Sequence, residues 1–282
     1  MRVLIDLHTH STVSDGTQPP AEVVASAAEA GVDVLGITDH DSTAGWAEAA
    51  AAAVEHGVAL VRGVEISCAR WGTSVHLLAY LLDPSSAPLL TEMELSRSSR
   101  ESRARRMTER LGRDYPITWD DVMAQVSEGT TIGRPHLADA LVAGGSFRDR
   151  DAAFATALHR SSRYHVAHYA PDPADAVRLV LGAGGVPVLA HPFAHTRGRV
   201  LDDETIEELV EAGLAGLEVD HRDHDDDARR RLREIAAEHD LVTTGSSDYH
   251  GSGKPNLLGE NTTHPGQLER IEAAGTLEVV LP

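Results

Sequence analysis

The chain has 282 residues, of which 41% are hydrophobic, and its formal net charge is −19 at pH 7. This length and apolar content suit one large domain or a barrel with an insertion. The charge argues against broad, sequence-independent binding to long duplex nucleic acid, which depends on many Lys and Arg side chains at phosphates. A small anionic substrate stays compatible with it, because bound metals and a few arginines can supply a local positive site.

The sequence also restricts the compartment. Its single cysteine, Cys68, excludes an intramolecular disulfide. No apolar stretch reaches the roughly 18 residues that a membrane span needs, and the first residues have the pattern of a strand, without a signal segment. We therefore expect a cytoplasmic protein that does not bind membranes.

Residues 1–82 alternate short β-branched runs with Ala-rich helical stretches. This pattern predicts, in order, strand 3–8, helix 20–30, strand 33–38, helix 44–56, strand 58–66 and strand 75–81. Such alternation is typical of parallel βα units. It returns after residue 171, with helix 173–182, strand 186–190, helix 203–212, strand 215–219, helix 225–239 and strand 241–245.

Residues 88–165 have a different pattern, with amphipathic helical stretches, few β-branched runs and many arginines. We interpret them as a helical insertion, or cap, in a barrel made of residues 1–87 and 166–282. Seven arginines fall within 17 residues of this insertion. Four of them share an arc of about 120° on one helix face, namely Arg100, Arg103, Arg106 and Arg110. A solvated face paired with Glu101 and Glu109 explains the pattern as well as an anion-binding face does.

Two further observations favour anion binding. Residues 96–106 contain no large apolar side chain that would anchor the helix. Arg134, Pro135 and His136 follow a Gly-containing turn and form a second candidate contact. Arginines that face a metal site can hold a phosphate through paired hydrogen bonds.

Histidine and acidic residues recur at the ends of the predicted strands or within short apolar runs. Nine of them form the candidate ligand set: His8, His10, Asp15, His40, Glu65, His76, His191, Asp248 and His250. Because α/β barrels place their chemistry at the carboxyl ends of strands, we expect these side chains to converge. Any one histidine alone is more typical of a surface or core residue. Four others lie in polar helical or loop sequence and receive no role: His56, His159, His224 and His239.

Four motifs in this order resemble those of the PHP (polymerase and histidinol phosphatase) family of metal-dependent phosphoesterases. They are His8-Thr9-His10, Thr38-Asp39-His40, Ala190-His191-Pro192 and Ser247-Asp248-Tyr249-His250-Gly251. Gly63-Val64-Glu65 and His76 match the intermediate ligand positions, so the resemblance spans essentially the whole chain. It implies an α/β fold, a distorted seven-stranded β/α barrel with a small helical insertion over the site. It also implies two or three divalent metal ions, and mixed imidazole and carboxylate ligands suit manganese, zinc or iron.

The resemblance further implies a division of the ligands. One ion takes His8, His10, Glu65 and Asp248, a second takes Asp15, His40 and His250, and a third takes His76 and His191 with Glu65 as a bridge. Hydrolysis would use a metal-bridging hydroxide. Catalytic roles would fall to Asp248 as a ligand and to His40 or His191 in proton transfer to the leaving oxygen.

Within the family, the insertion most resembles that of nucleoside 3′,5′-bisphosphate phosphatases and 5′-to-3′ exoribonucleases that act on short RNA. Arg100, Arg103, Arg134 and His136 would then grip a second phosphate of a nucleotide or short RNA. One departure is His165-Val166-Ala167-His168, where relatives tend to have Tyr-Val-Pro. Three other cations lie near motif strands and are expected to be surface charges: Arg197, Arg199 and Lys254.

Other functions stay open at this point. A histidinol-phosphate or sugar-phosphate phosphatase would use the same metal ligands, although a small monoester does not need an Arg-rich cap. A polymerase-associated proofreading module would have to act in trans, because the chain has no polymerase segment. A non-enzymatic metal-binding protein would be favoured by a lost ligand, yet every expected ligand position is filled.

Overall fold

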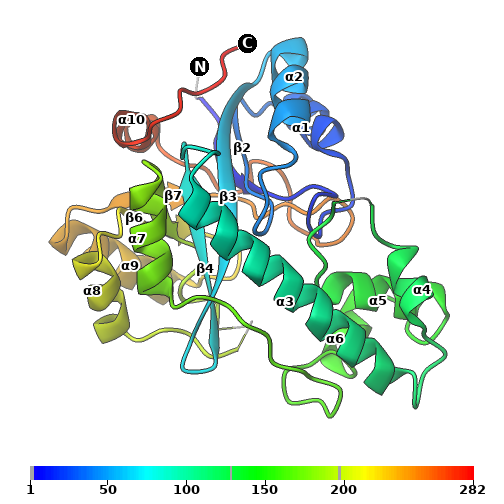
Figure 1. Cartoon of the computed structure of the whole chain (residues 1–282). Coiled ribbons are helices and arrows are strands. Elements are labelled where there is room, and N and C mark those ends of the chain that lie inside the picture. The colour runs from blue at the N-terminus through cyan, green and yellow to red at the C-terminus, as the bar shows by residue number, and fades with distance from the viewer. Residues whose placement is uncertain (1–2, 128, 196–197) are drawn as a thin grey trace.

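The computed structural model describes residues 3–127, 129–195 and 198–282. Seven strands form one mixed sheet in the order β1 to β7 (Figure 1). They are β1 (Ile5–Thr9), β2 (Val34–Ile37), β3 (Ala59–Arg70), β4 (Thr73–Tyr80), β5 (Val186–Leu189), β6 (Gly216–Asp220) and β7 (Val242–Gly245). Neighbouring strands are parallel from β1 to β3 and from β5 to β7, whereas β4 is antiparallel to both of its neighbours.

The expectation of parallel βα units is therefore wrong for β3 and β4. The two strands form a hairpin that ends with Arg70 opposite Thr73. Only Trp71 and Gly72 join them, and both have positive φ, 48° and 77°, as in the two-residue turns that favour hairpins. A parallel pair would need a crossover of about a dozen residues, so the short connection fixes the antiparallel arrangement.

The two edges of the sheet meet beyond β7. Thr9 at the end of β1 forms a parallel bridge with Tyr249, and the backbone N–H of His10 donates to the Tyr249 carbonyl at 2.8 Å. Near the other end of β1, the Thr263 N–H donates to the carbonyl of Ile5 at 2.9 Å. The sheet is thus a nearly closed barrel, and the predicted seven-stranded fold is confirmed.

Helices cover the outer face of the sheet (Figure 1). They are α1 (Pro20–Glu29), α2 (Trp46–His56), α7 (Pro173–Gly182), α8 (Asp203–Glu211) and α9 (Asp226–Glu238). The carboxylates of Asp172, Asp202 and Asp225 accept backbone N–H groups at the starts of α7, α8 and α9, which stabilises a helix by about 1 kcal/mol per cap. The buried faces of these helices and of the strands form one apolar cluster.

The opposite face of the strands forms a second apolar cluster. Alternate residues such as Ile5 and Leu7 belong to it, as the two-residue period of a strand requires. Helix α10 (Pro265–Ala274), for which the sequence pattern gave no prediction, contributes Leu268 and Ile271. This packing closes one end of the barrel and leaves the other end to the polar residues.

The insertion is helical, as predicted, with α3 (Ala87–Leu111), α4 (Trp119–Met123), α5 (Arg134–Ala143) and α6 (Arg150–Ala155). Figure 1 shows α3 running from the barrel to the group formed by α4, α5 and α6. Met93, early in α3, packs in the first apolar cluster, whereas Met107 and Leu111 pack in a separate cluster within the insertion. The domain boundaries given above stay a prediction. No helix in the described part of the chain combines the length and apolar character of a membrane span.

Candidate metal centre

The nine candidate ligand residues lie together at one end of the barrel. They come from the ends of β1, β2, β5 and β7, from the β3–β4 hairpin and from the following loops. Eight are buried, and His76 is half-buried. Ring contacts and ion pairs connect them into one group: His8, His10, Asp15, His40, Glu65, His76, His191, Asp248 and His250.

Glu65 contacts imidazoles with both of its carboxylate oxygens. Its Oε2 lies 3.1 Å from His10 Nε2 and 3.1 Å from His40 Nδ1. Its Oε1 lies 2.8 Å from His76 Nδ1 and 3.3 Å from His191 Nε2. One carboxylate therefore faces four histidines, so each of its oxygens would be available to a metal ion.

Four buried side-chain atoms of this group have no hydrogen-bond partner: Asp15 Oδ1, His40 Nδ1, His76 Nδ1 and His250 Nε2. Each lies near an opposite charge, on Glu65 or within the Asp15–His250 pair, but makes no hydrogen bond. A buried polar atom without a hydrogen bond costs about 1–3 kcal/mol. The four residues belong to sets of three whose ligand atoms lie within 4.8 Å of one another. Donor atoms around a tetrahedral ion with bonds of about 2.1 Å are about 3.4 Å apart. The residues therefore fit divalent metal ions.

The sets of donor atoms differ from the division that the family resemblance implies. They are His8, His10 and Glu65, then His10, Asp15 and His250, and then His40, Glu65 and His76. His40 lies closer to Glu65 than to Asp15. Its Nδ1 is 3.1 Å from Glu65 Oε2, whereas its Nε2 is 3.8 Å from Asp15 Oδ2. The assignment of each residue to one particular ion stays a prediction.

The ionisation of these groups in the metal-free protein differs from one residue to the next. Burial alone would raise the pKa of Glu65, but the nearby histidines His76, His40 and His8 together outweigh burial and hold this pKa well below its usual range. Burial together with Lys254 lowers the pKa of His250 to about 4. Burial also opposes the charge of His10, yet hydrogen bonds to Asp248 and Glu65 raise its pKa to about 9. A metal ion would therefore displace a proton from His10.

Three residues at this end of the barrel have an uncommon backbone conformation. His191, Asp41 and Asp248 have positive φ of 30°, 51° and 55°. Such a conformation costs an L-residue about 1–3 kcal/mol and persists where the surroundings hold it. The backbone N–H of His191, for example, donates to Glu218 Oε2 at 2.8 Å. The strained residues thus include two candidate ligands, His191 and Asp248, and the residue that follows His40.

Glu218 in β6 is a residue of the site that the sequence analysis missed. It is fully buried, and its Oε1 accepts a hydrogen bond from His8 Nδ1 at 3.0 Å. Burial opposes its ionisation, but His8, His221 and His191 together outweigh burial and lower the pKa of Glu218 to about 2. An acidic residue within the apolar run 215–219 is the same signal that marked Glu65, so the pattern could have revealed it.

Two further histidines lie beside the centre. His221 Nε2 is 3.5 Å from Asp248 Oδ2. His224, which received no role from its polar sequence context, is buried and accepts the backbone N–H of Phe193 at 3.2 Å. Its Nδ1 lies 2.8 Å from the Val219 carbonyl. His224 thus supports the loop that follows His191.

The four arginines of the face predicted on α3 differ in their partners. Arg100 is buried and pairs with Asp41, with Nε 3.1 Å from Oδ2. Arg103, one turn further, is also buried and donates to His168 Nδ1 at 3.3 Å. Arg106 and Arg110 instead donate to backbone carbonyls of residues 167 and 165. The four arginines therefore share a helix face but bind different kinds of acceptor: a carboxylate, an imidazole and backbone carbonyls.

Two other predicted substrate contacts lie in α5. Arg134 is half-buried and donates to the Leu158 carbonyl at 3.3 Å. His136 is buried, and its Nδ1 accepts the Gly133 N–H at 3.0 Å, which leaves Nε2 as the donor of the neutral ring.

The three cations expected at the surface have different outcomes. Arg199 is exposed, and Arg197 lies outside the described residues. Lys254 is not a plain surface charge, because its Nζ donates to Asp248 Oδ2 at 3.0 Å. The turn after β7 brings its side chain back to the metal centre, a contact that the sequence pattern did not reveal.

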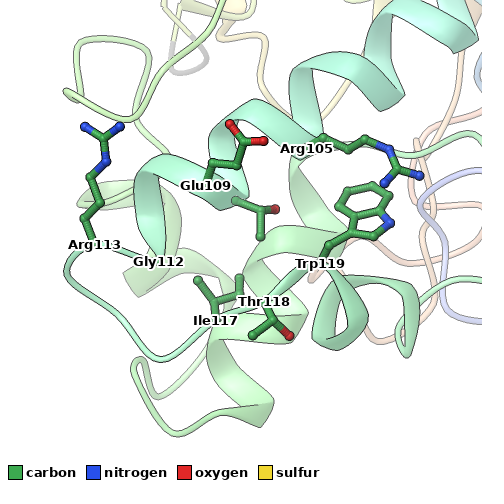
Figure 2. Close-up of a pocket in the computed structure, with 8 residues that line it drawn as sticks. Arg105, Glu109, Gly112, Arg113, Ile117, Thr118 and Trp119 are labelled. Atoms are coloured by element: carbon green, nitrogen blue, oxygen red, sulfur yellow. The ribbon is translucent and has the colours of Figure 1, made fainter.

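A hollow of about 370 Å³ on the insertion lies apart from these residues (Figure 2). Arg105 and Trp119 line it, with the guanidinium 4.2 Å from the centre of the indole ring. Both Arg105 Nε and Nη2 donate to Glu101. No predicted ligand or phosphate contact lines this hollow, so its chemistry differs from that of the centre.

Comparison with known proteins agrees with this site. The PHP domain model matches residues 6–136. A 3′,5′-nucleoside bisphosphate phosphatase of Chromobacterium violaceum is 36% identical over 89% of this chain and 88% of its own. A 5′-3′ exoribonuclease of Haemophilus influenzae is 32% identical over 87% and 89%. A phosphoribosyl 1,2-cyclic phosphate 1,2-diphosphodiesterase of Eggerthella lenta is 34% identical over 87% and 94%.

A solved structure agrees as well. A protein of Bifidobacterium adolescentis, described as a metal-dependent phosphoesterase, has a TM-score of 0.94 with this chain at 46% identity, with 96% of each chain covered. The barrel, the cluster of metal-binding side chains and the full-length similarity point to the same conclusion. The chain belongs to the PHP family of metal-dependent phosphoesterases.

Proposed function

We propose that this phosphoesterase acts on small nucleotides that carry a second phosphate. Its substrates are nucleoside 3′,5′-bisphosphates, cleaved at the 3′-phosphate, and short 5′-phosphorylated RNA, cleaved in the 5′-to-3′ direction. The observation that carries the proposal is a pair of insertion arginines, Arg103 and Arg134, without a carboxylate partner among the described residues.

The surroundings of Arg103 and Arg134 are strongly positive. Burial, together with Arg100 and Arg134, holds the pKa of Arg103 well below its usual range. Burial and the nearby Arg160 lower the pKa of Arg134 to about 10. The buried Arg103 Nε has no hydrogen-bond partner. Uncompensated buried charge is costly for the protein alone, and a bound phosphate would relieve it.

The partner of Arg103 preserves its charge. Burial and the charges of Arg103 and Arg100 lower the pKa of His168 to about 2, so this imidazole is neutral near pH 7. His168 can orient the guanidinium by accepting its hydrogen bond but cannot neutralise it. A neutral acceptor therefore lies beside the arginine.

Arg100 ties this positive group to the metal centre. It pairs with Asp41, the residue after His40, and donates to Ser67 in β3. The backbone N–H of Asp41 in turn donates to the Glu65 carbonyl at 3.0 Å. Arg103 lies three residues beyond Arg100, so it is displaced by about one helical turn, or 5 Å. A second phosphate bound there is separated from the reacting phosphate by a spacer such as a ribose.

The candidate ligands would hold divalent ions, which lower the pKa of water and neutralise charge on the phosphoryl group. His40 and His191 are each 8% exposed, whereas His8 and His10 are fully buried. The first two therefore border the space open to substrate and are our candidates for proton transfer at the leaving oxygen. Burial holds the pKa of His40 well below its usual range, so this ring would have to take up a proton from water before passing it on. Arg103, Arg134 and His136 would orient the far phosphate and fix which ester reaches the centre.

The relatives support the nucleotide substrate without deciding it. Two of the three named above are a bisphosphate phosphatase and an exoribonuclease, and the third acts on a cyclic phosphate diester. All three names describe phosphate esters. Our choice of a nucleotide substrate among these phosphate esters therefore rests on the arginines of the insertion.

The test measures phosphate and nucleotide release by the manganese-loaded protein. Substrates are adenosine 3′,5′-bisphosphate, a short 5′-phosphorylated RNA, the same RNA without its 5′-phosphate, and histidinol phosphate. We expect the first two to be preferred. Arg103→Ala should lower kcat/KM for them by about 10- to 100-fold, the effect of losing a hydrogen bond between charged groups.

Arg106→Ala is the matched control, because Arg106 lies on the same helix but donates to backbone carbonyls. It should leave kcat/KM close to wild type. Preference for histidinol phosphate, or equal rates for RNA with and without the 5′-phosphate, would refute the nucleotide proposal and leave the phosphoesterase activity in place.

A further inference from the structure

Lys254 is the only lysine of this chain. The other 24 of its 25 basic Lys and Arg residues are arginines. The surface ion pairs use arginine, as in the exposed pair of Arg178 with Asp175. The single lysine instead lies beside the metal centre, four residues after His250.

The contacts of Lys254 reach a candidate metal ligand. Its Nζ lies 3.0 Å from Asp248 Oδ2. The other oxygen, Oδ1, lies 3.5 Å from His8 Nε2 and 3.4 Å from His10 Nε2. Asp248 thus presents Oδ1 to the ligand group and Oδ2 to the ammonium and, at 3.5 Å, to His221 Nε2. The Lys254 side chain is 33% exposed, so it is not sealed within the ligand group.

Buried hydrogen bonds fix the segment that carries Lys254. Asn256 Nδ2 donates to the Ser247 carbonyl at 2.6 Å, and Asn256 is buried. The Gly259 N–H donates to Asp6 Oδ2 at 2.9 Å. These contacts flank Lys254 on its C-terminal side, while the ligand motif fixes its N-terminal side. The position of the ammonium is therefore built into the fold.

We propose that Lys254 binds the reacting phosphoryl group of the substrate, in addition to holding Asp248. An ammonium has three N–H donors, and Asp248 uses one of them. The two others can reach non-bridging oxygens of a phosphoryl group that lies over the ligand group. Lysine suits this position because it is a compact point charge, whereas arginine has a wide planar fork. The proposal rests on the phosphoesterase activity of the family and not on the nucleotide substrate.

The single lysine permits a direct test on the unmodified protein. An amine-acylating reagent can modify only Lys254 and the α-amino group, and mass spectrometry follows the two separately. We expect inorganic phosphate, added to the manganese-loaded protein, to slow acylation of Lys254 at least several-fold and to leave the α-amino group unaffected. Equal acylation of Lys254 with and without phosphate would overturn the proposal.

Variants separate phosphate binding from support of Asp248. Lys254→Met should lower the affinity for inorganic phosphate by about 10- to 100-fold, as measured by calorimetry at saturating manganese. It should also lower kcat/KM, and Lys254→Arg should restore only part of the loss. Arg178→Met, which removes an exposed positive charge, should change neither quantity. A Lys254→Met protein that binds less manganese but binds phosphate normally once loaded would show that Lys254 only supports Asp248, and the proposal would be wrong.

Discussion

Glu218 holds His8 in one orientation and one tautomer. Its Oε1 accepts a hydrogen bond from His8 Nδ1 at 3.0 Å, so the lone pair of the neutral ring lies on Nε2, which faces the other candidate ligands. Carboxylates that hold metal-binding histidines in this way raise the basicity of the ring and keep it aligned. Glu218 also accepts the backbone N–H of His191 and thereby links the ligands of β1 and β5.

Replacing Glu218 should weaken metal binding although the residue is not among the candidate ligands. We expect Glu218→Gln to lower manganese affinity by about 10- to 100-fold, the usual effect of losing such a partner. Isothermal titration calorimetry measures it. Glu211→Gln, at an exposed position in α8, is the control. Equal affinities of wild type and Glu218→Gln would contradict this role.

Glu65 and His250 should differ in how many ions they hold. Glu65 belongs to two of the three sets of donor atoms, whereas His250 belongs to one. We therefore expect Glu65→Ala to lose more bound metal per chain than His250→Ala, measured by elemental analysis after gel filtration. If both variants lose the same amount, Glu65 does not act as a shared ligand.

Metal affinity should rise with pH between about 7 and 9. In the metal-free protein the pKa of His10 is raised to about 9, so the ring is protonated below that pH and a metal ion must displace its proton. The carboxylates of Glu218 and Glu65 outweigh burial and raise the pKa of His8 as well, so its proton must also be displaced. Affinity should increase by up to about tenfold per pH unit for each of the two rings. Calorimetry in buffers of different ionisation enthalpy should detect at least about one proton released near pH 7.5. No proton release would refute this assignment.

Arg100 and Arg103 should have opposite effects on stability. Arg100→Met leaves the buried carboxylate of Asp41 without its ion pair, which costs about 3–5 kcal/mol. Arg103→Met removes a buried charge that has no carboxylate partner, and should keep or raise stability by about 1 kcal/mol. Urea denaturation of the metal-free proteins measures both. A large loss for Arg103→Met would show that its charge is compensated within the protein.

The sequence by itself determined most elements and the candidate ligands. Helix 173–182 and strand 186–190 lie within one residue of α7 and β5, because amphipathic and β-branched periodicities are local properties of the chain. The ligand motifs were visible because His8 and His191 stand at the ends of apolar runs. The β3–β4 hairpin was not predicted, because the expected strands end at residue 66 and begin at residue 75. The observed strands extend to Arg70 and from Thr73, which shortens their connection to two residues.

Only the tertiary structure decided what each polar residue does. Glu218 gains its role from His8, more than 200 residues away in sequence. Arg100 and Arg103 are the same residue type on one helix face, and only the position of Asp41 makes the first a structural ion pair and leaves the second without a carboxylate. Lys254 resembles a surface charge until the turn after β7 brings it to Asp248. Periodicity reports which side of an element is buried, whereas partners depend on distances that only the closed barrel fixes.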